Sequence, residues 1–512
     1  MSNPIRSATL AALACLSFSA VDAMAEGAEI IVAVPAQPES LDTHVTTSAE
    51  PNQISRIIFE GLITQNAKME PMPALAESWE VSEDGKTYTF KLRDGVVFHD
   101  GTPLEVEDVV ASMERWTRLS APGRASVGKG TWRAGEEPNT VVLEVPNASF
   151  TVLYTLSSGA QQNAAIMPRE ILEEAGDLPV RTYVGTGPLK LDSWVPDQSI
   201  TLVKNDDYTA FEGPKDGLSG DRTTEYDTIT FNFVSDQSTR SYGLLTGIYD
   251  INTDVPADSL ADLRDKEGIT LKPYPWTSLN IIFNKTVGLF TDIKARRAIH
   301  IGVDREELML AGVDPEFFHL THHQMFASQE AIWNTEVGKA DFNPVDIEGA
   351  RELLAETDYD GSELVVLTSS DYSDMYYPAI VLQQQLLGMG IKSRIDAYDW
   401  PTFAEKRQMP SEWQIIVLSN TYKIEPSLLT HYNPKFPGWT NDPALPELLA
   451  EYRATPTIEA ASAKYDELQE WYITYLPSTK VGDIDSVLAY GPKIADLPMM
   501  EGTVYWAIEL AD

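Results

Sequence analysis

Alternation of apolar and polar residues marks one part of the chain as antiparallel sheet. Between residues 79 and 101, apolar and polar positions alternate, and three Asp-Gly pairs separate the pieces as turns. Residues 102–105, Thr-Pro-Leu-Glu, have the pattern of a capping box, which predicts a helix from there to about Trp116. A further strand is predicted over residues 140–145. Together these elements predict a small α+β subdomain.

Helix and strand patterns alternate further along the chain. Residues 304–312 begin with a capping box, Asp-Arg-Glu-Glu, and predict a short helix. Apolar residues recur at helical spacing over 347–354 and 379–387, and apolar strands are predicted over 363–368 and 391–395. Helices that alternate with strands in this way are typical of a parallel sheet packed by helices.

Composition and charge narrow the class of protein. The chain has 512 residues, of which 43% are hydrophobic and 22% are charged. This hydrophobic content is enough to form large buried cores. A single core stops growing at roughly 250 to 300 residues, so at least two lobes are expected. Lys and Arg number 38 against 77 Asp and Glu, a net charge of −39. No basic run is present, which argues against a nucleic-acid partner.

The first 25 residues have the pattern of a secretory signal peptide. Arg6 provides a positive charge, residues 8–19 are apolar but too short to span a bilayer, and small residues precede Glu26. The only cysteine, Cys15, lies inside this segment, so cleavage after Ala25 would leave no thiol and no disulfide. A lipid anchor on Cys15 is the disfavoured alternative, because the leucine usually found three residues ahead is missing. We therefore predict a periplasmic protein without a lipid anchor.

Motifs of catalysis are missing from the sequence. It contains no Gly-x-Ser-x-Gly elbow, no His-Glu-x-x-His, no Walker loop and no Gly-x-Gly-x-x-Gly after a strand. Carboxylate pairs carry no information in so acidic a chain. We predict that the protein is not an enzyme.

Three of the seven histidines lie within five residues, at 319, 322 and 323. On a helix, His319 would share a face with His322 or His323, and imidazoles so placed ligate transition metals. Without thiols, and beside Pro315 and two phenylalanines, a loop or helix end with solvated histidines is the favoured interpretation. We predict no metal and no cofactor.

Residues 73–115, which include Leu-Arg-Asp-Gly-Val and Phe-His-Asp-Gly, strongly resemble the signature of the family 5 extracytoplasmic solute-binding proteins. These are the dipeptide- and oligopeptide-binding components of ABC importers and their relatives. Further blocks that resemble the family follow in its order, at residues 185–191, 204–208, 245–250, 296–306 and 350–354. The resemblance covers nearly the whole chain after the signal segment.

The resemblance implies an α/β fold: the bilobed periplasmic-binding-protein (type II, Venus flytrap) fold, with an additional α+β subdomain in the first lobe. It implies a monomer that closes on a small-molecule solute between its lobes and delivers it to ABC transporter permease subunits. The expected division of the chain is 1–25 signal peptide, 26–70 first part of lobe I, 71–184 inserted subdomain, 185–271 second part of lobe I, 272–480 lobe II, and 481–512 return to lobe I.

Two departures from the dipeptide-binding branch of the family concern its ionic anchors. That branch has an aspartate for the peptide ammonium where this chain has Tyr422, and a neutral phenol beside a lysine cannot replace it. The branch also places an arginine for the peptide carboxylate where residues 369–374 contain none. We therefore expect a non-peptide solute, such as an opine or a sugar–amino acid conjugate. A dipeptide or oligopeptide, a metal or metal chelate, and a secreted hydrolase are the alternatives.

The expected solute contacts are hydroxyls, an amide and aromatic rings at the edge of the cleft. Trp276, at the crossing between the lobes, could stack on a ring of the solute. The remaining candidates are Tyr422, Asn420, Ser419, Ser369 and Ser370 from the second lobe, and Trp116 and His44 from the first.

Overall fold

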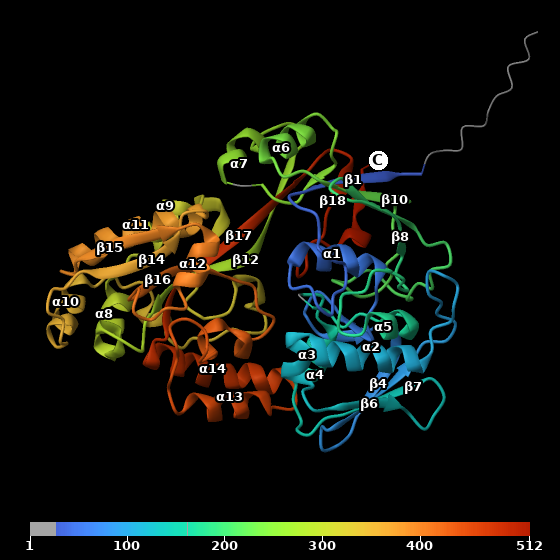
Figure 1. The fold of residues 1–512 in the computed structure, drawn as a ribbon, viewed down its shortest axis with the longest axis horizontal. Coiled ribbons are helices and arrows are strands. Elements are labelled where there is room, and N and C mark those ends of the chain that lie inside the picture. Colours follow the sequence, from blue (N-terminus) through green and yellow to red (C-terminus); the bar gives the residue numbers. More distant parts are fainter. Residues whose placement is uncertain (1–26, 161, 256, 512) are drawn as a thin grey trace, which may run out of the picture.

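The computed structural model describes residues 27–160, 162–255 and 257–511, which form two lobes joined by one eleven-stranded sheet (Figure 1). Ten strands follow one path through this sheet, and β13 (Phe318–His319) is attached to it through β17. In order, the ten are β15 (Ser393–Tyr398), β14 (Leu364–Ser369), β16 (Ile415–Thr421), β12 (Thr270–Phe283), β17 (Ser478–Tyr490), β11 (Ile251–Asn252), β1 (Glu29–Val34), β10 (Thr228–Phe233), β9 (Ser199–Lys204) and β8 (Leu189–Val195).

The first lobe is built on β1, which pairs in parallel with β10 and β11. Its hydrophobic core includes Ile30, Val32 and Val34 from β1, together with Ile57 and Trp506. Three helices and two small sheets complete it: α1 (Ala49–Ile58), α6 (Gln237–Leu245), α7 (Ala257–Leu263), β2 (Ile63–Gln65) with β3 (Pro71–Pro73), and β18 (Ile494–Asp496) with β19 (Glu509–Leu510).

A four-stranded antiparallel sheet and four helices form the α+β subdomain at the lower right of Figure 1. The sheet order is β4 (Ala76–Val81), β5 (Thr87–Leu92), β7 (Thr140–Glu144) and β6 (Thr131–Ala134), and the helices are α2 (Val106–Leu119), α3 (Ala121–Ser126), α4 (Thr151–Ser157) and α5 (Arg169–Ala175). The strand predicted over 140–145 is confirmed by β7. The sheet and the helices bury one shared core that includes Phe90, Trp116 and Trp132.

The helix predicted to begin with residues 102–105 starts later than expected. In the structure, α2 begins at Val106, and the backbone N–H of Glu105 donates to the carboxylate of Asp108 at 2.9 Å. Thr102 is not available as a cap, because its hydroxyl donates to Asp100 at 2.6 Å and its carbonyl accepts from the N–H of Phe98. The prediction of a capping box at Thr102 was therefore wrong by three residues, since a tight turn uses the residue that the sequence pattern offered as a cap.

The second lobe has the predicted parallel sheet, in which β14 pairs in parallel with both β15 and β16. Asp304 caps α9, and its carboxylate accepts from the N–H groups of Glu306 and Glu307, as the sequence predicted. The helices of this lobe are α8 (Ile293–Gly302), α9 (Arg305–Gly312), α10 (Ile347–Ala355), α11 (Ser373–Gly388), α12 (Trp400–Lys406), α13 (Leu445–Arg453) and α14 (Ile458–Tyr475). Short 3₁₀ helices in the chain are η1 (Leu289–Thr291), η2 (Pro315–Phe317), η3 (Ala327–Gln329), η4 (Lys339–Asp341), η5 (Pro426–Leu428), η6 (Thr430–Tyr432) and η7 (Tyr505–Ala507).

The two longest strands, β12 and β17, run through both lobes as an antiparallel pair. Their register shifts twice, once at Trp276 on β12 and once at Val481 on β17. The lobe boundaries expected after residues 271 and 480 fall inside these strands. The exact division of the chain into lobes stays a prediction, because both lobes share this pair.

None of the helices in the described part of the chain is both long and apolar enough to cross a membrane. The predicted signal segment, 1–25, and with it Cys15, lies outside the described residues.

Candidate functional site

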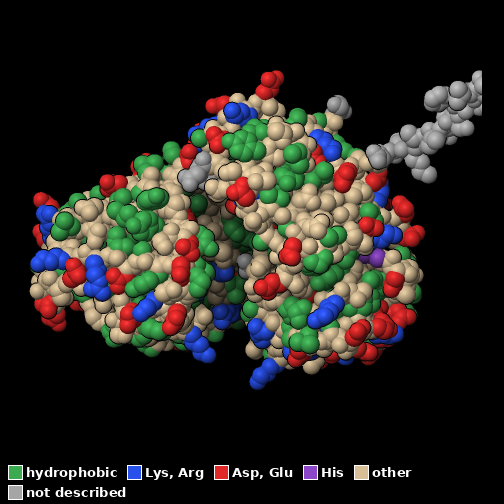
Figure 2. All heavy atoms as spheres, turned by 45° about the horizontal axis from the view of Figure 1, so that its top comes forward, with side chains coloured by type: hydrophobic (Ala, Val, Ile, Leu, Met, Phe, Trp, Pro, Cys, Tyr) green, Lys and Arg blue, Asp and Glu red, His purple; other side chains and the backbone are tan. Residues whose placement is uncertain are grey.

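A cavity of about 260 Å³ lies between the two lobes, at the crossing strands. Figure 2 shows the groove that separates the lobes on one face of the molecule. Three parts of the chain line the cavity: Thr47, Ala121, Pro122, Ala160 and Gln162 from the first lobe and its subdomain, Trp276 from β12, and Tyr422, Lys423, Ile424 and Leu428 from the segment after β16. A solute held there would contact both lobes at once.

Trp276 reaches the cavity because it is the extra residue of a β-bulge. On β17, Asp485 pairs with Pro275 and Ile484 pairs with Thr277, so Trp276 has no partner on that strand. A bulge of this kind bends a strand and re-aims the side chain of the unpaired residue. The indole stacks on the ring of Tyr422, with 5.8 Å between the ring centroids and 3° between the planes.

The segment that carries Tyr422 is held by one buried amide. The side-chain nitrogen of Gln329 donates to the hydroxyl of Tyr422 at 2.9 Å, to the carbonyl of Lys423 at 2.9 Å and to that of Ile424 at 3.2 Å. Burial raises the pKa of Tyr422 well above its usual value, so the phenol stays neutral. The aromatic wall of the cavity is thus neutral and fixed in position.

Gln162 forms the wall on the first lobe. Its side-chain oxygen accepts from the backbone N–H of Ala121 at 2.9 Å, and its side-chain nitrogen donates to the carbonyl of His44 at 3.3 Å. Its backbone has a positive φ of 56° and donates to the side-chain oxygen of Asn52 at 3.2 Å. These contacts bring three distant segments of the first lobe to one side of the cavity.

The charge of the cavity comes from one lysine. Among the described residues that line it, Lys423 is the only charged one, and none is a carboxylate. The lysine Nζ lies 3.4 Å from the hydroxyl of Thr421, and burial lowers the pKa of Lys423. The cavity therefore combines a flat aromatic wall, an amide and a single cation.

A second contact closes the cleft beyond the cavity, where α4 approaches the connection between α13 and α14 (Figure 1). The backbone N–H of Phe150 donates to the carbonyl of Thr455 at 2.8 Å. The ring of Phe150 packs edge-on against Tyr452, with 5.4 Å between centroids, and lies 6.2 Å from the ring of Trp333. The subdomain of the first lobe thus touches the second lobe directly.

Of the residues predicted as solute contacts, the structure brings Trp276 and Tyr422 to the cavity and leaves the polar ones outside it. Ser419 donates to Asp374 on α11 at 2.6 Å, and Asn420 accepts from Thr430 at 3.3 Å. Ser369 is fully buried at the end of β14, and Ser370 after it is exposed to solvent. These four residues lie in or just after the last residues of β14 and β16, and none of them lines the cavity.

Trp116, predicted as a contact from the first lobe, does not reach the cavity. It is fully buried in the core of the subdomain, and its indole nitrogen donates to the backbone carbonyl of Gln162 at 2.7 Å. Trp116 therefore supports a residue of the wall from behind, because helix α2 turns its ring inward.

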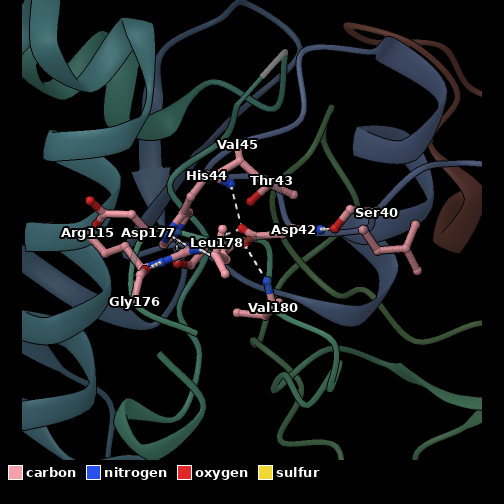
Figure 3. Close-up of polar contacts among 12 residues, drawn as sticks. Ser40, Asp42, Thr43, His44, Val45, Arg115, Gly176, Asp177, Leu178 and Val180 are labelled. Atoms are coloured by element: carbon pink, nitrogen blue, oxygen red, sulfur yellow. Dashed lines mark hydrogen bonds and ion pairs between the residues drawn. The ribbon is translucent and has the colours of Figure 1, made fainter. Parts of the chain in front are cut away.

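His44, the other candidate of the first lobe, is also fully buried and belongs to an ion-pair network (Figure 3). Arg115 pairs with Asp42 at 2.7 Å and donates to Nδ1 of His44 at 3.1 Å, while Nε2 of His44 lies 2.9 Å from the carbonyl of Ala165. Burial lowers the pKa of His44 to about 4, so the ring is neutral and donates from Nε2. The network anchors the loop that leads to Thr47 and offers no free group to a solute.

The three clustered histidines turn to different partners. His319 pairs with Asp485 at 3.0 Å, and that carboxylate raises the pKa of His319. His322 contacts the carbonyl of Thr335, and His323 is buried, which lowers its pKa to about 3. No group of three or more His, Cys, Asp or Glu side chains that could hold a metal ion occurs in the described ranges.

The sequence interpretation missed the wall of the first lobe and the amide behind Tyr422. Lys423 could have been predicted from the sequence as a cavity residue, because it directly follows Tyr422, which was predicted as a solute contact. The other missed residues carry no local motif and come from several separate segments of the chain: Thr47, Ala121, Pro122, Ala160, Gln162, Gln329, Ile424 and Leu428. Only the folded arrangement shows that they belong together.

A comparison with protein families matches residues 70–433 to the model of bacterial extracellular solute-binding proteins, family 5 middle. The probable peptide ABC transporter periplasmic-binding protein y4tO of Sinorhizobium fredii is 26% identical over 486 residues, 90% of each chain. The glutathione-binding protein GsiB of Escherichia coli K12 is 28% identical over 384 residues, 72% of this chain and 70% of that protein.

Solved structures show the same fold. The binding protein AgaA of A. tumefaciens R10, in complex with agropinic acid, is 25% identical with a TM-score of 0.72, covering 94% of this chain and 99% of AgaA. The ABC transporter substrate-binding protein CtaP of Listeria monocytogenes is 19% identical with a TM-score of 0.81, covering 95% of this chain and 100% of CtaP. These similarities confirm the predicted α/β fold with two lobes.

Proposed function

The chain belongs to the bacterial extracellular solute-binding proteins of family 5, the substrate-binding components of ABC importers, and we propose that its solute is a small non-peptide compound such as an opine or a sugar–amino acid conjugate. Members of this family bind solutes for import and are not enzymes. The proposed solute occupies the cavity between the lobes, beside Trp276 and Tyr422.

The observation that carries this proposal is the charge of the cavity wall. A plain dipeptide is a zwitterion, and its ammonium group needs a carboxylate or several oxygen acceptors when it leaves water. The described residues of the wall include no carboxylate, and the position that would supply one has the neutral Tyr422. A solute with hydroxyl groups and a ring matches the aromatic wall and the amide better.

Similar proteins give support of two kinds. AgaA, which binds agropinic acid in its solved structure, is about as similar in sequence as the relative named a probable peptide-binding protein. The names of y4tO and GsiB keep a peptide as the second candidate. A specific observation favours the first candidate, since the ammonium partner that a free peptide requires is missing from the described wall.

The cavity suits import by closure of the two lobes. Its walls come from both lobes, so a solute stabilises the closed form in proportion to its greater affinity for that form. We further propose that residues 1–25 direct export to the periplasm and are removed with Cys15, and that the monomer delivers its solute to the permease.

Thermal shift and calorimetry test the proposal on the purified protein without residues 1–25. Agropinic acid and other opines, sugar–amino acid conjugates, dipeptides and glutathione are compared. We expect one of the non-peptide compounds to bind with the highest affinity and to return chemically unchanged. At a free concentration of 100 times its Kd, it would stabilise the folded state by about 2.7 kcal/mol. A dipeptide or glutathione as the tightest ligand, or conversion of any compound, would contradict the proposal.

A further inference from the structure

Lys423 lines the cavity between the lobes without a carboxylate partner. No Asp or Glu oxygen of the described residues lies within 4.0 Å of its Nζ, which contacts the hydroxyl of Thr421 at 3.4 Å. Shortage of acids does not explain this, because the chain has 77 acidic residues for 38 basic ones. A half-buried cation that remains unpaired in so acidic a chain is available to an anion from outside.

Two other lysines of the same lobe are buried, and each donates to at least two oxygen atoms of the chain at 3.2 Å or less. Lys480 lies 2.7 Å from Asp483 and also donates to the carbonyl of Met325 at 2.6 Å. Lys285 donates to two backbone carbonyls, at 3.0 and 2.9 Å. Burial of an ammonium group is costly unless oxygen atoms accept its hydrogen bonds, and the chain supplies at least two such acceptors to each of these lysines. For Lys423 the described residues supply one hydroxyl, at 3.4 Å.

The position of Lys423 is fixed in relation to the aromatic wall. Its backbone carbonyl accepts from Gln329 at 2.9 Å, and its neighbour Tyr422 donates its backbone N–H to the carbonyl of Trp276 at 2.8 Å. Lys423 therefore lines the cavity together with Trp276 and the apolar Leu428. The arrangement matches a ligand with a negative group beside a ring or an apolar body.

We infer that Lys423 binds a carboxylate of the solute, so that the cavity selects an organic acid over its neutral analogue. The inference rests on the proposed function, because it assigns a charge to the solute of that same cavity. The carboxylate would take the place of the missing ion-pair partner, while the remainder of the solute packs against the aromatic wall.

Benzoate and benzamide, which differ in charge and share a ring, provide the first test. Ligand-observed NMR titrations compare the wild type with Lys423→Met, Lys423→Arg and a matched control, Lys392→Met, whose side chain is exposed outside the cavity. We expect benzoate to bind the wild type and the control at least about tenfold more tightly than benzamide. Lys423→Met should remove that preference and Lys423→Arg should keep it. Equal binding of both compounds to the wild type, or equal benzoate affinity in the two Met variants, would overturn the inference.

A second test separates this inference from the proposed function. Agropinic acid, glutathione and a dipeptide are each compared with their methyl esters on the same four proteins. If an acid binds, and if esterification of the acid and Lys423→Met each lower its affinity by about tenfold or more, the inference stands, whichever acid it is. If an opine ester binds as tightly as the acid, and Lys423→Met has no effect, the proposed function stands and the inference fails. If a dipeptide binds tightest and depends on Lys423, the proposed function fails and the inference stands.

Discussion

Trp276 and Tyr422 are bound to each other through both their backbones and their rings. The N–H of Tyr422 donates to the carbonyl of Trp276 at 2.8 Å, and their rings lie parallel within 3°. Trp276 belongs to the crossing strand β12, and Tyr422 follows the last residue of β16 in the second lobe. A rearrangement of the crossing strands would therefore also move the aromatic wall, which couples the geometry of the hinge to the geometry of the site.

Removal of the Trp276 indole should weaken binding of the solute and have little effect on the stability of the fold. We expect Trp276→Ala to reduce solute affinity about tenfold or more, because the ring supplies stacking and apolar contact on one wall. Because Trp276 is only partly buried, the free energy of unfolding should fall by only about 1 kcal/mol. Calorimetry and urea denaturation measure the two effects. Trp400→Ala is the control, since this tryptophan packs on Tyr372 away from the cavity. Unchanged affinity in Trp276→Ala would refute the role of the ring.

The amide behind the aromatic wall should matter for both stability and binding. Gln329→Ala leaves the hydroxyl of Tyr422 and the carbonyls of Lys423 and Ile424 without their buried donor. Buried polar groups left unsatisfied cost about 1 to 3 kcal/mol each, so we expect the free energy of unfolding to fall by about 3 kcal/mol. Affinity should fall as well, because the segment loses its support. Urea denaturation and calorimetry check this, with the exposed Gln384→Ala as control. Equal stability of the two variants would contradict it.

Stability at mildly acidic pH should depend on His44. Its folded pKa is about 4, against an ordinary value of 6.5, because the ring is buried. Between these pH values the unfolded chain binds a proton at His44 that the folded chain does not. The free energy of unfolding therefore rises with pH, by up to about 1.4 kcal/mol per pH unit from this group. This contribution of His44 is lost as the pH falls from 6.5 toward 4.

The variant His44→Gln isolates this contribution, because glutamine can still donate and accept but does not titrate. We expect the difference in unfolding free energy between wild type and variant to grow by about 3 kcal/mol from pH 4 to pH 6.5 in urea titrations. His319→Gln is a control of opposite sign, since Asp485 raises the pKa of His319, and its contribution is lost as the pH rises. Parallel curves for wild type and His44→Gln would show that His44 is not the titrating group.

Sequence patterns succeeded where short-range contacts decide the structure. The cap at Asp304 and the parallel strands around α11 were predictable, because hydrogen bonds between near neighbours and helical periodicity create them. At Thr102 the same reasoning was wrong, since a turn with Asp100 competed for the threonine hydroxyl. Local signals of equal quality can thus give different outcomes, depending on which partners the folded chain supplies.

The site was predictable only in part. Trp276 was suggested by its position at the crossing between the lobes, and Tyr422 by its place where the dipeptide-binding branch has an aspartate; the structure brings both to the cavity. Trp116 and His44 are of residue types that bind ligands equally well, but the core of the subdomain and the Arg115 network bury them. Burial depends on contacts far apart in the chain, which a single sequence does not reveal.

Closure of the lobes should depend on Phe150, whose ring and backbone connect the subdomain to the second lobe. Phe150→Ala removes the ring contacts with Tyr452 and Trp333, so we expect the open form to be more populated. Small-angle scattering should then show a larger radius of gyration without solute, a decrease on addition of solute, and a weaker apparent affinity, because binding must also drive closure. Phe211→Ala is the control, as this ring lies over Arg93 within the first lobe. If both variants scatter like the wild type with and without solute, the Phe150 contact does not hold the lobes together, and closure must depend on the cavity itself.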